Sequence, residues 1–229
     1  MRYENKFVLD GFLYHDIYNQ IMLSPAFFRE IYYERRVNNI YLDSFDYANY
    51  YANINGEHNR MKQRIRWYGD TMEAKTPILE YKIKHGELGT KEYYEMPDFK
   101  LDASFIYSDY LALLPEHIKN FNEQYFEMYN DISQLMPTLY NTYDRRYFLS
   151  GDGKYRLTID RNMNYSKISK TFAGQYFFNS RDIVIELKYD EDDVLGACEL
   201  IQHFNFRLSR NSKYVNGVSG LYFNNIEFD

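Results

Sequence analysis

Hydrophobic and polar side chains alternate in steps of two along five segments of the chain. Successive side chains of a β-strand point to opposite faces, so this pattern predicts strands with one mainly apolar and one mainly charged face. The five segments are Arg2–Leu9, Met61–Trp67, Leu79–Lys84, Tyr155–Asp160 and Ile183–Lys188. Weaker strand candidates are Asn39–Leu42, Glu92–Met96 and Tyr147–Leu149.

Apolar residues recur at helical spacing in three longer segments. These are His15–Tyr33, which Pro25 divides into two pieces, Ser108–Ser133, which Pro115 interrupts, and Asp192–Phe206. Proline removes a backbone donor and clashes with the preceding turn, so each interruption predicts two shorter helices.

Turn signals separate several of these elements. Gly69-Asp70 is a turn signal, and the glycine-containing Ser150–Gly153 predicts a hairpin between two of the strands. Without a linker-like or repeated segment, the pattern predicts one domain spanning residues 1–229. The fold class predicted is α+β, an antiparallel barrel whose charged faces point inward and whose outward apolar faces helices could cover.

The amino-acid composition excludes several classes of protein. The 26 Tyr and 17 Phe suit a β-rich fold, and the net charge of -6 argues against a general nucleic-acid-binding protein. Cys198 is the one cysteine, so an internal disulfide is excluded, and we expect it to be a small core residue. The charged N-terminus and the lack of an apolar run of about 18 residues predict a soluble, cytoplasmic chain without a membrane segment.

Basic residues are concentrated on the charged faces of the predicted strands. A solvated outer face would explain a single run such as Lys62, Arg64 and Arg66, but several alternating segments carry basics while the chain is net acidic. Like charges on neighbouring positions repel, so a bound polyanion is the better explanation. The other basics on such faces are Lys6, Lys82, Lys84, Arg156 and Lys188.

Carboxylates lie among these basics. Glu4, Glu80, Glu186 and Asp160 offer the hard oxygen ligands that Mg²⁺ or Mn²⁺ prefers. Each of them could instead pair with a neighbouring Lys, and for Glu80 both interpretations stay open. Glu186 ranks first as a ligand, because its place between Ile185 and Leu187 predicts burial and therefore a need for partners.

Nine motifs along the chain resemble, in order, a known family. They are Arg2-Tyr-Glu-Asn-Lys6, Asn39-Ile-Tyr-Leu-Asp43, Lys62-Gln-Arg-Ile-Arg-Trp-Tyr68, Glu80-Tyr-Lys82, Lys91, Tyr143-Asp-Arg145, Tyr155-Arg-Leu-Thr-Ile-Asp160, Ile185-Glu-Leu-Lys188 and Ser212-Lys-Tyr214. The chain resembles the catalytic domain of the vacuolar transporter chaperone (VTC) complex, a polyphosphate polymerase domain of the triphosphate tunnel metalloenzyme superfamily.

The resemblance implies an eight-stranded antiparallel tunnel with flanking helices and its phosphate-binding side chains inside. The catalytic residues it implies are Lys6, Arg64, Arg66, Lys82, Arg145 and Arg156. Further phosphate-binding residues are Lys62, Lys91, Lys188, Arg210 and Lys213. The resemblance places Glu186 at the position of the family's metal-binding glutamate, for Mn²⁺ or Mg²⁺, and Glu4 and Glu80 are further candidate metal ligands. Arg2 stands where the superfamily has its first Glu, which weakens the case for a second metal on this strand.

The activity implied is transfer of the ATP γ-phosphate to a growing inorganic polyphosphate chain. The partners are then ATP and polyphosphate, with no nucleic acid, and a partner protein stays unknown. Two alternatives use the same residues: a tripolyphosphate or nucleoside-triphosphate hydrolase, and a non-catalytic polyphosphate-binding module.

Overall fold

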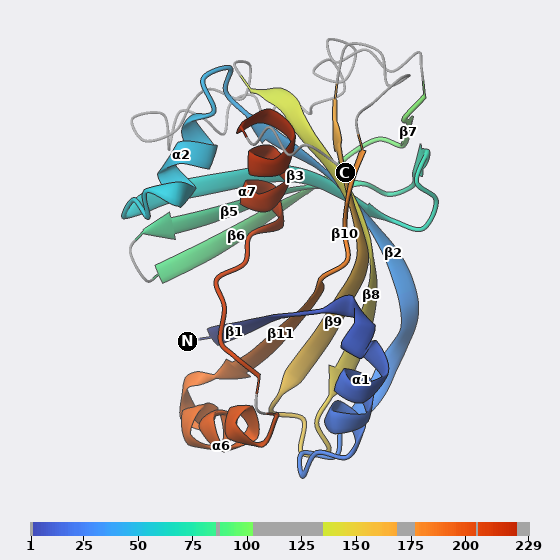
Figure 1. The fold of residues 1–229 in the computed structure, drawn as a ribbon. Coiled ribbons are helices and arrows are strands. Elements are labelled where there is room, and N and C mark those ends of the chain that lie inside the picture. Colours follow the sequence, from blue (N-terminus) through green and yellow to red (C-terminus); the bar gives the residue numbers. More distant parts are fainter. Residues whose placement is uncertain (1, 86–87, 103–134, 169–176, 205, 224–229) are drawn as a thin grey trace. The chain divides into compact units, whose positions relative to one another are not determined.

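The computed structural model describes residues 2–85, 88–102, 135–168, 177–204 and 206–223 (Figure 1). Antiparallel strands dominate, with a few helices, and this confirms the α+β class. Hydrogen bonds join the strands of the main sheet in the order β1-β11-β9-β8-β2-β3-β5-β6, with β10 beside β9. A closed eight-stranded barrel stays a prediction. The helical segment expected over Ser108–Ser133 lies outside the described residues.

Each predicted strand lies, apart from at most one end residue, within an observed strand, and most of the observed strands are longer than predicted. The strands are β1 (Arg2–Leu9), β2 (Arg29–Asp43), β3 (Asn59–Tyr68), β4 (Glu73–Ala74), β5 (Ile78–His85), β6 (Leu88–Glu95), β7 (Phe99–Lys100), β8 (Met136–Leu149), β9 (Arg156–Lys167), β10 (Phe177–Ser180) and β11 (Ile183–Asp190). The helices are α1 (Tyr14–Met22), α2 (Ala48–Ile54), α6 (Val194–Phe204) and α7 (Lys213–Val218), with short turns η1 (Gly11–Leu13), η3 (Glu191–Asp193) and η4 (Ser219–Phe223). The turn at Ser150–Gly153 joins β8 to β9, and Gly153 there has a φ of +78° that favours glycine.

The chain forms two compact units. The first contains the described residues of Met1–Arg36, Tyr143–Met163 and Asn179–Ser212; the second contains those of Val37–Thr142, Asn164–Phe178 and Lys213–Asp229. The long strands β2, β8 and β9 contribute residues to both units. The single domain over residues 1–229 stays a prediction.

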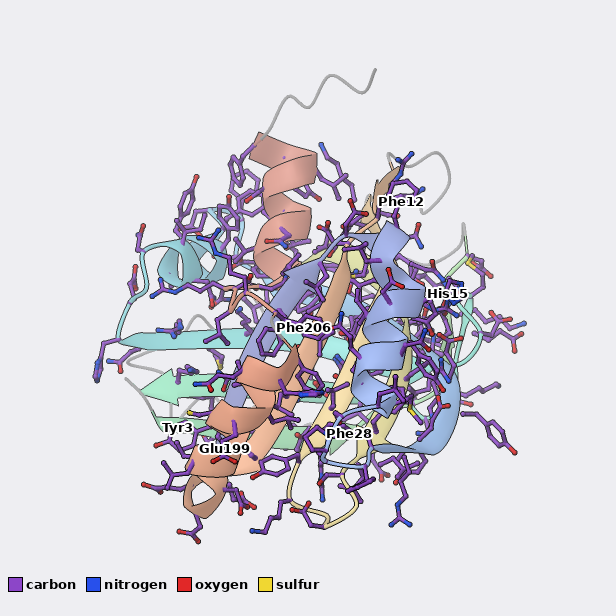
Figure 2. All side chains as sticks on the ribbon, turned by 60° about the horizontal axis from the view of Figure 1, so that its bottom comes forward. Tyr3, Phe12, His15, Phe28, Glu199 and Phe206 are labelled. Atoms are coloured by element: carbon purple, nitrogen blue, oxygen red, sulfur yellow. The ribbon has the colours of Figure 1, made fainter. Side chains whose placement is uncertain are left out.

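In the first unit, helices cover the apolar face of the strands. Figure 2 shows α1 and α6 over this part of the sheet, with Phe28 and Phe206 on the same side. Both helices and three of the strands contribute nearly fully buried residues to this core: Ile17, Ile21, Leu200 and Phe204 from the helices, and Phe7, Leu157, Ile159, Ile185 and Leu187 from the strands. The apolar face predicted from the alternation is therefore the buried face here, and the charged side chains occupy the other one.

In the second unit, Trp67 lies in the apolar core beside the strands. Its ring is fully buried, stacks on Tyr140 at 6.0 Å between centroids, and meets Phe99 edge-on at 5.5 Å. Strands β3, β5 and β6 lie side by side here (Figure 1). Their apolar positions bury together: Met61, Ile65, Leu79, Tyr81 and Ile83. This leaves Lys62, Arg64 and Arg66 on the opposite face of β3, as the alternation predicts.

Two predictions about local structure were wrong. The helical pattern of His15–Tyr33 ends at Met22, and Arg29 to Tyr33 belong to β2. Pro25 breaks the helix, and the β-branched and aromatic residues after it suit a strand. Cys198 is exposed and not in the core, because α6 buries the side that carries Ala197, Leu200 and Phe204.

None of the helices in the described segments combines the length and the hydropathy needed to cross a bilayer. The cytoplasmic location stays a prediction.

The carboxylate of Asp43 ties two helices of the second unit to the end of β2. Its Oδ1 accepts hydrogen bonds from the backbone N–H groups of Ser44 (2.8 Å) and Asn49 (2.9 Å). Its Oδ2 accepts from the backbone N–H of Tyr50 (3.0 Å), at the start of α2, and from the Tyr214 hydroxyl on α7. Burial raises the pKa of Asp43, although these hydrogen bonds oppose the shift. Asp43 is thus the shared anchor of α2 and α7.

We expect Tyr214→Phe to lower the free energy of unfolding by about 1–3 kcal/mol, because it removes a hydrogen bond to a buried carboxylate while keeping the ring. Urea denaturation measures this. Tyr33→Phe is the matched control, since Tyr33 is 94% exposed and the change there should have almost no effect. Equal stability of Tyr214→Phe and wild type would contradict the anchoring role of Asp43.

Candidate phosphate-binding site

Three lysines form a row across the second unit's sheet. Strand pairing places Lys62 of β3 opposite Lys82 of β5, and Lys82 opposite Lys91 of β6. Lys62 and Lys82 are partly buried and Lys91 is exposed. Directly paired side chains on one face have their Cβ atoms about 4.5–5.5 Å apart, and like charges at that separation destabilise a sheet. An anion bound along this row would compensate that repulsion.

One pair further along the same face, two arginines hold Glu80. Arg64 lies opposite Glu80, and its Nε and Nη2 atoms lie 2.6 Å and 2.5 Å from Oε2. Arg66 Nη1 lies 3.6 Å from Oε1. Burial alone would raise the pKa of Glu80, but the two guanidinium groups outweigh it and lower the pKa. Glu80 is therefore an ionised counter-ion that orients both arginines.

Two residues of the Asn39–Asp43 motif, to which the sequence analysis assigned no role in the site, complete this arrangement. Asn39 Oδ1 accepts a hydrogen bond from Arg66 Nε at 2.9 Å, and the Tyr41 hydroxyl accepts one from Arg64 Nη1 at 3.3 Å. Both lie on β2 as direct cross-strand partners of the arginines. They fix the orientation of each guanidinium group through some of its donors.

We expect Glu80→Gln to destabilise the chain at neutral pH and to make its stability less sensitive to acid. Because the folded-state pKa of Glu80 is lowered, its stabilising contribution is present above the ordinary value of 4.5 and is lost as the pH falls from there through the folded pKa. Urea denaturation of both proteins between about pH 7 and about pH 3 should therefore show a stability difference that shrinks with acidity.

The exposed Glu95 offers the matched control. Glu95→Gln should leave the stability nearly unchanged at every pH. A difference between wild type and Glu80→Gln that stays constant or grows as the pH falls would contradict the ion-pair assignment.

In the first unit, Glu186 is the centre of a second charged cluster. It is 7% exposed, and it lies opposite Lys6 of β1. Lys6 Nζ is 3.3 Å from Glu186 Oε1 and 3.0 Å from Glu4 Oε1. Lys188 Nζ is 3.3 Å from Glu186 Oε2 and 3.5 Å from Glu4 Oε2. Two carboxylates therefore share two ammonium groups on one face of the sheet.

Arg145 of β8 closes this cluster on its other side. Its Nε and Nη2 atoms bind both oxygens of the fully buried Asp160, at 2.5 Å and 2.6 Å, and Nη2 lies 3.6 Å from Glu186 Oε2. Burial would lower the pKa values of Arg145 and Lys6. The neighbouring carboxylates outweigh it, Asp160 for Arg145 and Glu186 for Lys6, so both pKa values are raised. Both side chains thus remain cationic at neutral pH.

The remaining basics predicted for the site have different surroundings. Arg156 is exposed on β9, opposite Lys188. Arg210 is also exposed, whereas Lys213 is buried at the first position of α7, next to Tyr214. The structure thus gathers Lys6, Arg145 and Lys188 in the first unit, and Lys62, Arg64, Arg66, Lys82 and Lys91 in the second.

The donor set of the first cluster fits a divalent ion only in part. The described residues contain no group of three or more His, Cys, Asp or Glu side chains arranged to hold a metal. Glu4 and Glu186, however, both contact Lys6, and Mg²⁺ is commonly held by one or two carboxylates with phosphate and water oxygens completing the shell. These two residues fit such a site. The carboxylate of Glu80 binds Arg64 and Arg66. Its role as a metal ligand stays a prediction.

Comparison with known proteins identifies a matching family and solved structures of similar fold. The sequence model of one family, the VTC domain, matches residues 1–222. Among curated proteins no sequence relative matches the chain. A putative adenylyl cyclase from Hippeastrum, described as having a dominant triphosphatase activity, is 15% identical, with 96% of each chain covered and a TM-score of 0.54.

Two further solved structures are similar to the chain. A putative adenylate cyclase from Bacillus halodurans is 14% identical, with 96% of each chain covered and a TM-score of 0.54. The PH1819 protein from Pyrococcus horikoshii is 12% identical, with 96% of this chain and 99% of that one covered and a TM-score of 0.51. At such identities the likeness is one of fold, and that fold is the triphosphate tunnel.

Proposed function

The chain belongs to the VTC domain family, and on that basis we propose that it is a polyphosphate polymerase that uses ATP. The observation that carries this proposal is the row of Lys62, Lys82 and Lys91 beside the oriented Arg64 and Arg66. A linear polyanion matches the positive charge along such a row, and Arg binds phosphate oxygens through two parallel hydrogen bonds. The triphosphatase activity described for the Hippeastrum protein is consistent with a triphosphate substrate.

The proposed reaction moves one phosphoryl group. The bond between the γ-phosphorus and the β,γ-bridging oxygen of ATP breaks, and the terminal oxygen of the polyphosphate chain forms a new bond to that phosphorus. ADP leaves, and the chain is one phosphate longer. Such a transfer needs little covalent chemistry from the protein, so positioning and charge stabilisation supply the catalysis.

The residues of the two clusters have separate roles in this proposal. The proposed catalytic residues, Lys6, Arg145 and Arg156 in the first unit and Arg64, Arg66 and Lys82 in the second, each neutralise phosphate oxygens of a bound substrate. Lys62, Lys91, Lys188, Arg210 and Lys213 bind other phosphates of the substrates. Glu186 and Glu4 would hold a divalent ion, Mn²⁺ or Mg²⁺, which when bound offsets the negative charge of the phosphate oxygens.

Incubation of the purified protein with ATP and Mn²⁺ or Mg²⁺, followed by separation of the products by chain length, tests the proposal. We expect long polyphosphate and a matching amount of ADP. Glu186→Gln should abolish this metal-dependent activity, because the amide is neutral and binds the ion poorly, whereas Glu95→Gln, at an exposed position, should retain it.

Other product patterns would contradict the polymerase. Orthophosphate and ADP without chains would show a hydrolase that uses water in place of the polyphosphate end. Binding of tripolyphosphate that is equally tight with a chelator, with no consumption of ATP, would show a non-catalytic binding module.

A further inference from the structure

Among the described residues, Thr158 carries one of the buried hydroxyl groups that take part in no hydrogen bond. Its side chain is 9% exposed, and within the described residues its Oγ1 atom has no hydrogen-bond partner. Buried hydroxyl groups nearly always form a hydrogen bond, because an unpaired one loses its hydrogen bonds to water and gains none within the protein. Valine has almost the same shape and the same preference for a strand, and it would avoid this cost.

The strand pattern places this hydroxyl on the charged face of the first unit. Leu157 and Ile159, on either side of Thr158, are fully buried in the apolar core, so Thr158 points to the opposite face of β9 together with Arg156 and Asp160. It therefore faces away from the apolar residues that would bury a hydroxyl for packing alone.

Strand register brings Thr158 next to the candidate metal ligand. Thr158 lies directly opposite Glu186 on β11, and Glu186 lies directly opposite Lys6 on β1. A cation, a carboxylate and a hydroxyl thus stand in one row across three strands. Side chains paired in this way are close enough to contact one ligand together.

The carboxylates on this face of the sheet already bind cations. Both oxygens of Asp160 bind Arg145, one oxygen of Glu186 binds Lys6, and the other lies 3.3 Å from Lys188 Nζ. The hydroxyl is therefore left as a donor at a place where cations on three strands attract an anion. A phosphate oxygen is the acceptor that such surroundings would bring to it.

We propose that Thr158 is a further substrate-binding residue, whose hydroxyl donates a hydrogen bond to a non-bridging phosphate oxygen of the bound triphosphate beside Glu186. This inference rests on the proposed function, since it needs a phosphate substrate in the first cluster. A neutral donor adds a directional contact there without adding to the repulsion among Lys6, Arg145 and Lys188.

The test compares Thr158→Val, which removes the hydroxyl and keeps the shape, with Thr158→Ser, which keeps the hydroxyl. The affinity of each protein for inorganic tripolyphosphate is measured by calorimetry, and the thermal midpoint is measured without ligand. We expect Thr158→Val to bind about five- to tenfold more weakly than wild type, and Thr158→Ser to stay within about twofold. The ligand-free Thr158→Val should have an unchanged or higher midpoint, because an unpaired buried donor is gone.

Three results would overturn the inference. If Thr158→Val binds tripolyphosphate as tightly as the wild type, the hydroxyl does not contact the substrate. Equal weakening in Thr158→Val and Thr158→Ser would assign the effect to packing. A wild-type protein that binds no tripolyphosphate would overturn the proposed function, and the inference with it.

Discussion

A buried carboxylate on a strand can persist only among cations, and Glu186 imposes this constraint on the first unit. At 7% exposure, its charge would be very costly without partners. Lys6, Lys188 and Arg145 each come from a different strand to meet it, and Asp160 in turn holds Arg145. The charge of one glutamate is therefore balanced by cations from three strands. The same group is the best candidate ligand for a divalent ion, so a metal would enter a site whose cations are already in place.

The two clusters differ in how their charge is balanced. In the first, the carboxylates Glu4, Glu186 and Asp160 lie among the basic side chains. In the second, Glu80 holds two arginines, and the neighbouring row sets Lys62, Lys82 and Lys91 directly opposite one another. A metal-assisted transfer needs carboxylates near the reacting group, whereas binding of a polyphosphate chain needs a basic surface. In the proposed function, the first cluster would meet the first requirement and the second cluster the second.

Alternation along the chain predicted much of this arrangement. Lys62, Arg64 and Arg66 lie on the polar face of β3, and the burial of Glu186 among cations follows from its apolar neighbours. Strand β2 broke the pattern: Arg29–Arg36 is mostly exposed and Val37–Asp43 is buried on both faces, so neither half alternates. Which strands pair, and in which register, depends on contacts between distant segments. The sequence pattern therefore could not predict the lysine row, the role of Asp43 or the position of Thr158 beside Glu186.

Binding of phosphates of increasing length to the wild-type protein tests the central claim, that these basic faces bind a linear polyanion, most directly. Calorimetric titration with orthophosphate, tripolyphosphate and longer polyphosphate should give affinities that rise by about tenfold or more from the first to the second, and that fall as salt is added. Arg64→Ala should weaken the binding of tripolyphosphate. Affinities that do not depend on chain length, or the absence of binding at low salt, would contradict the account.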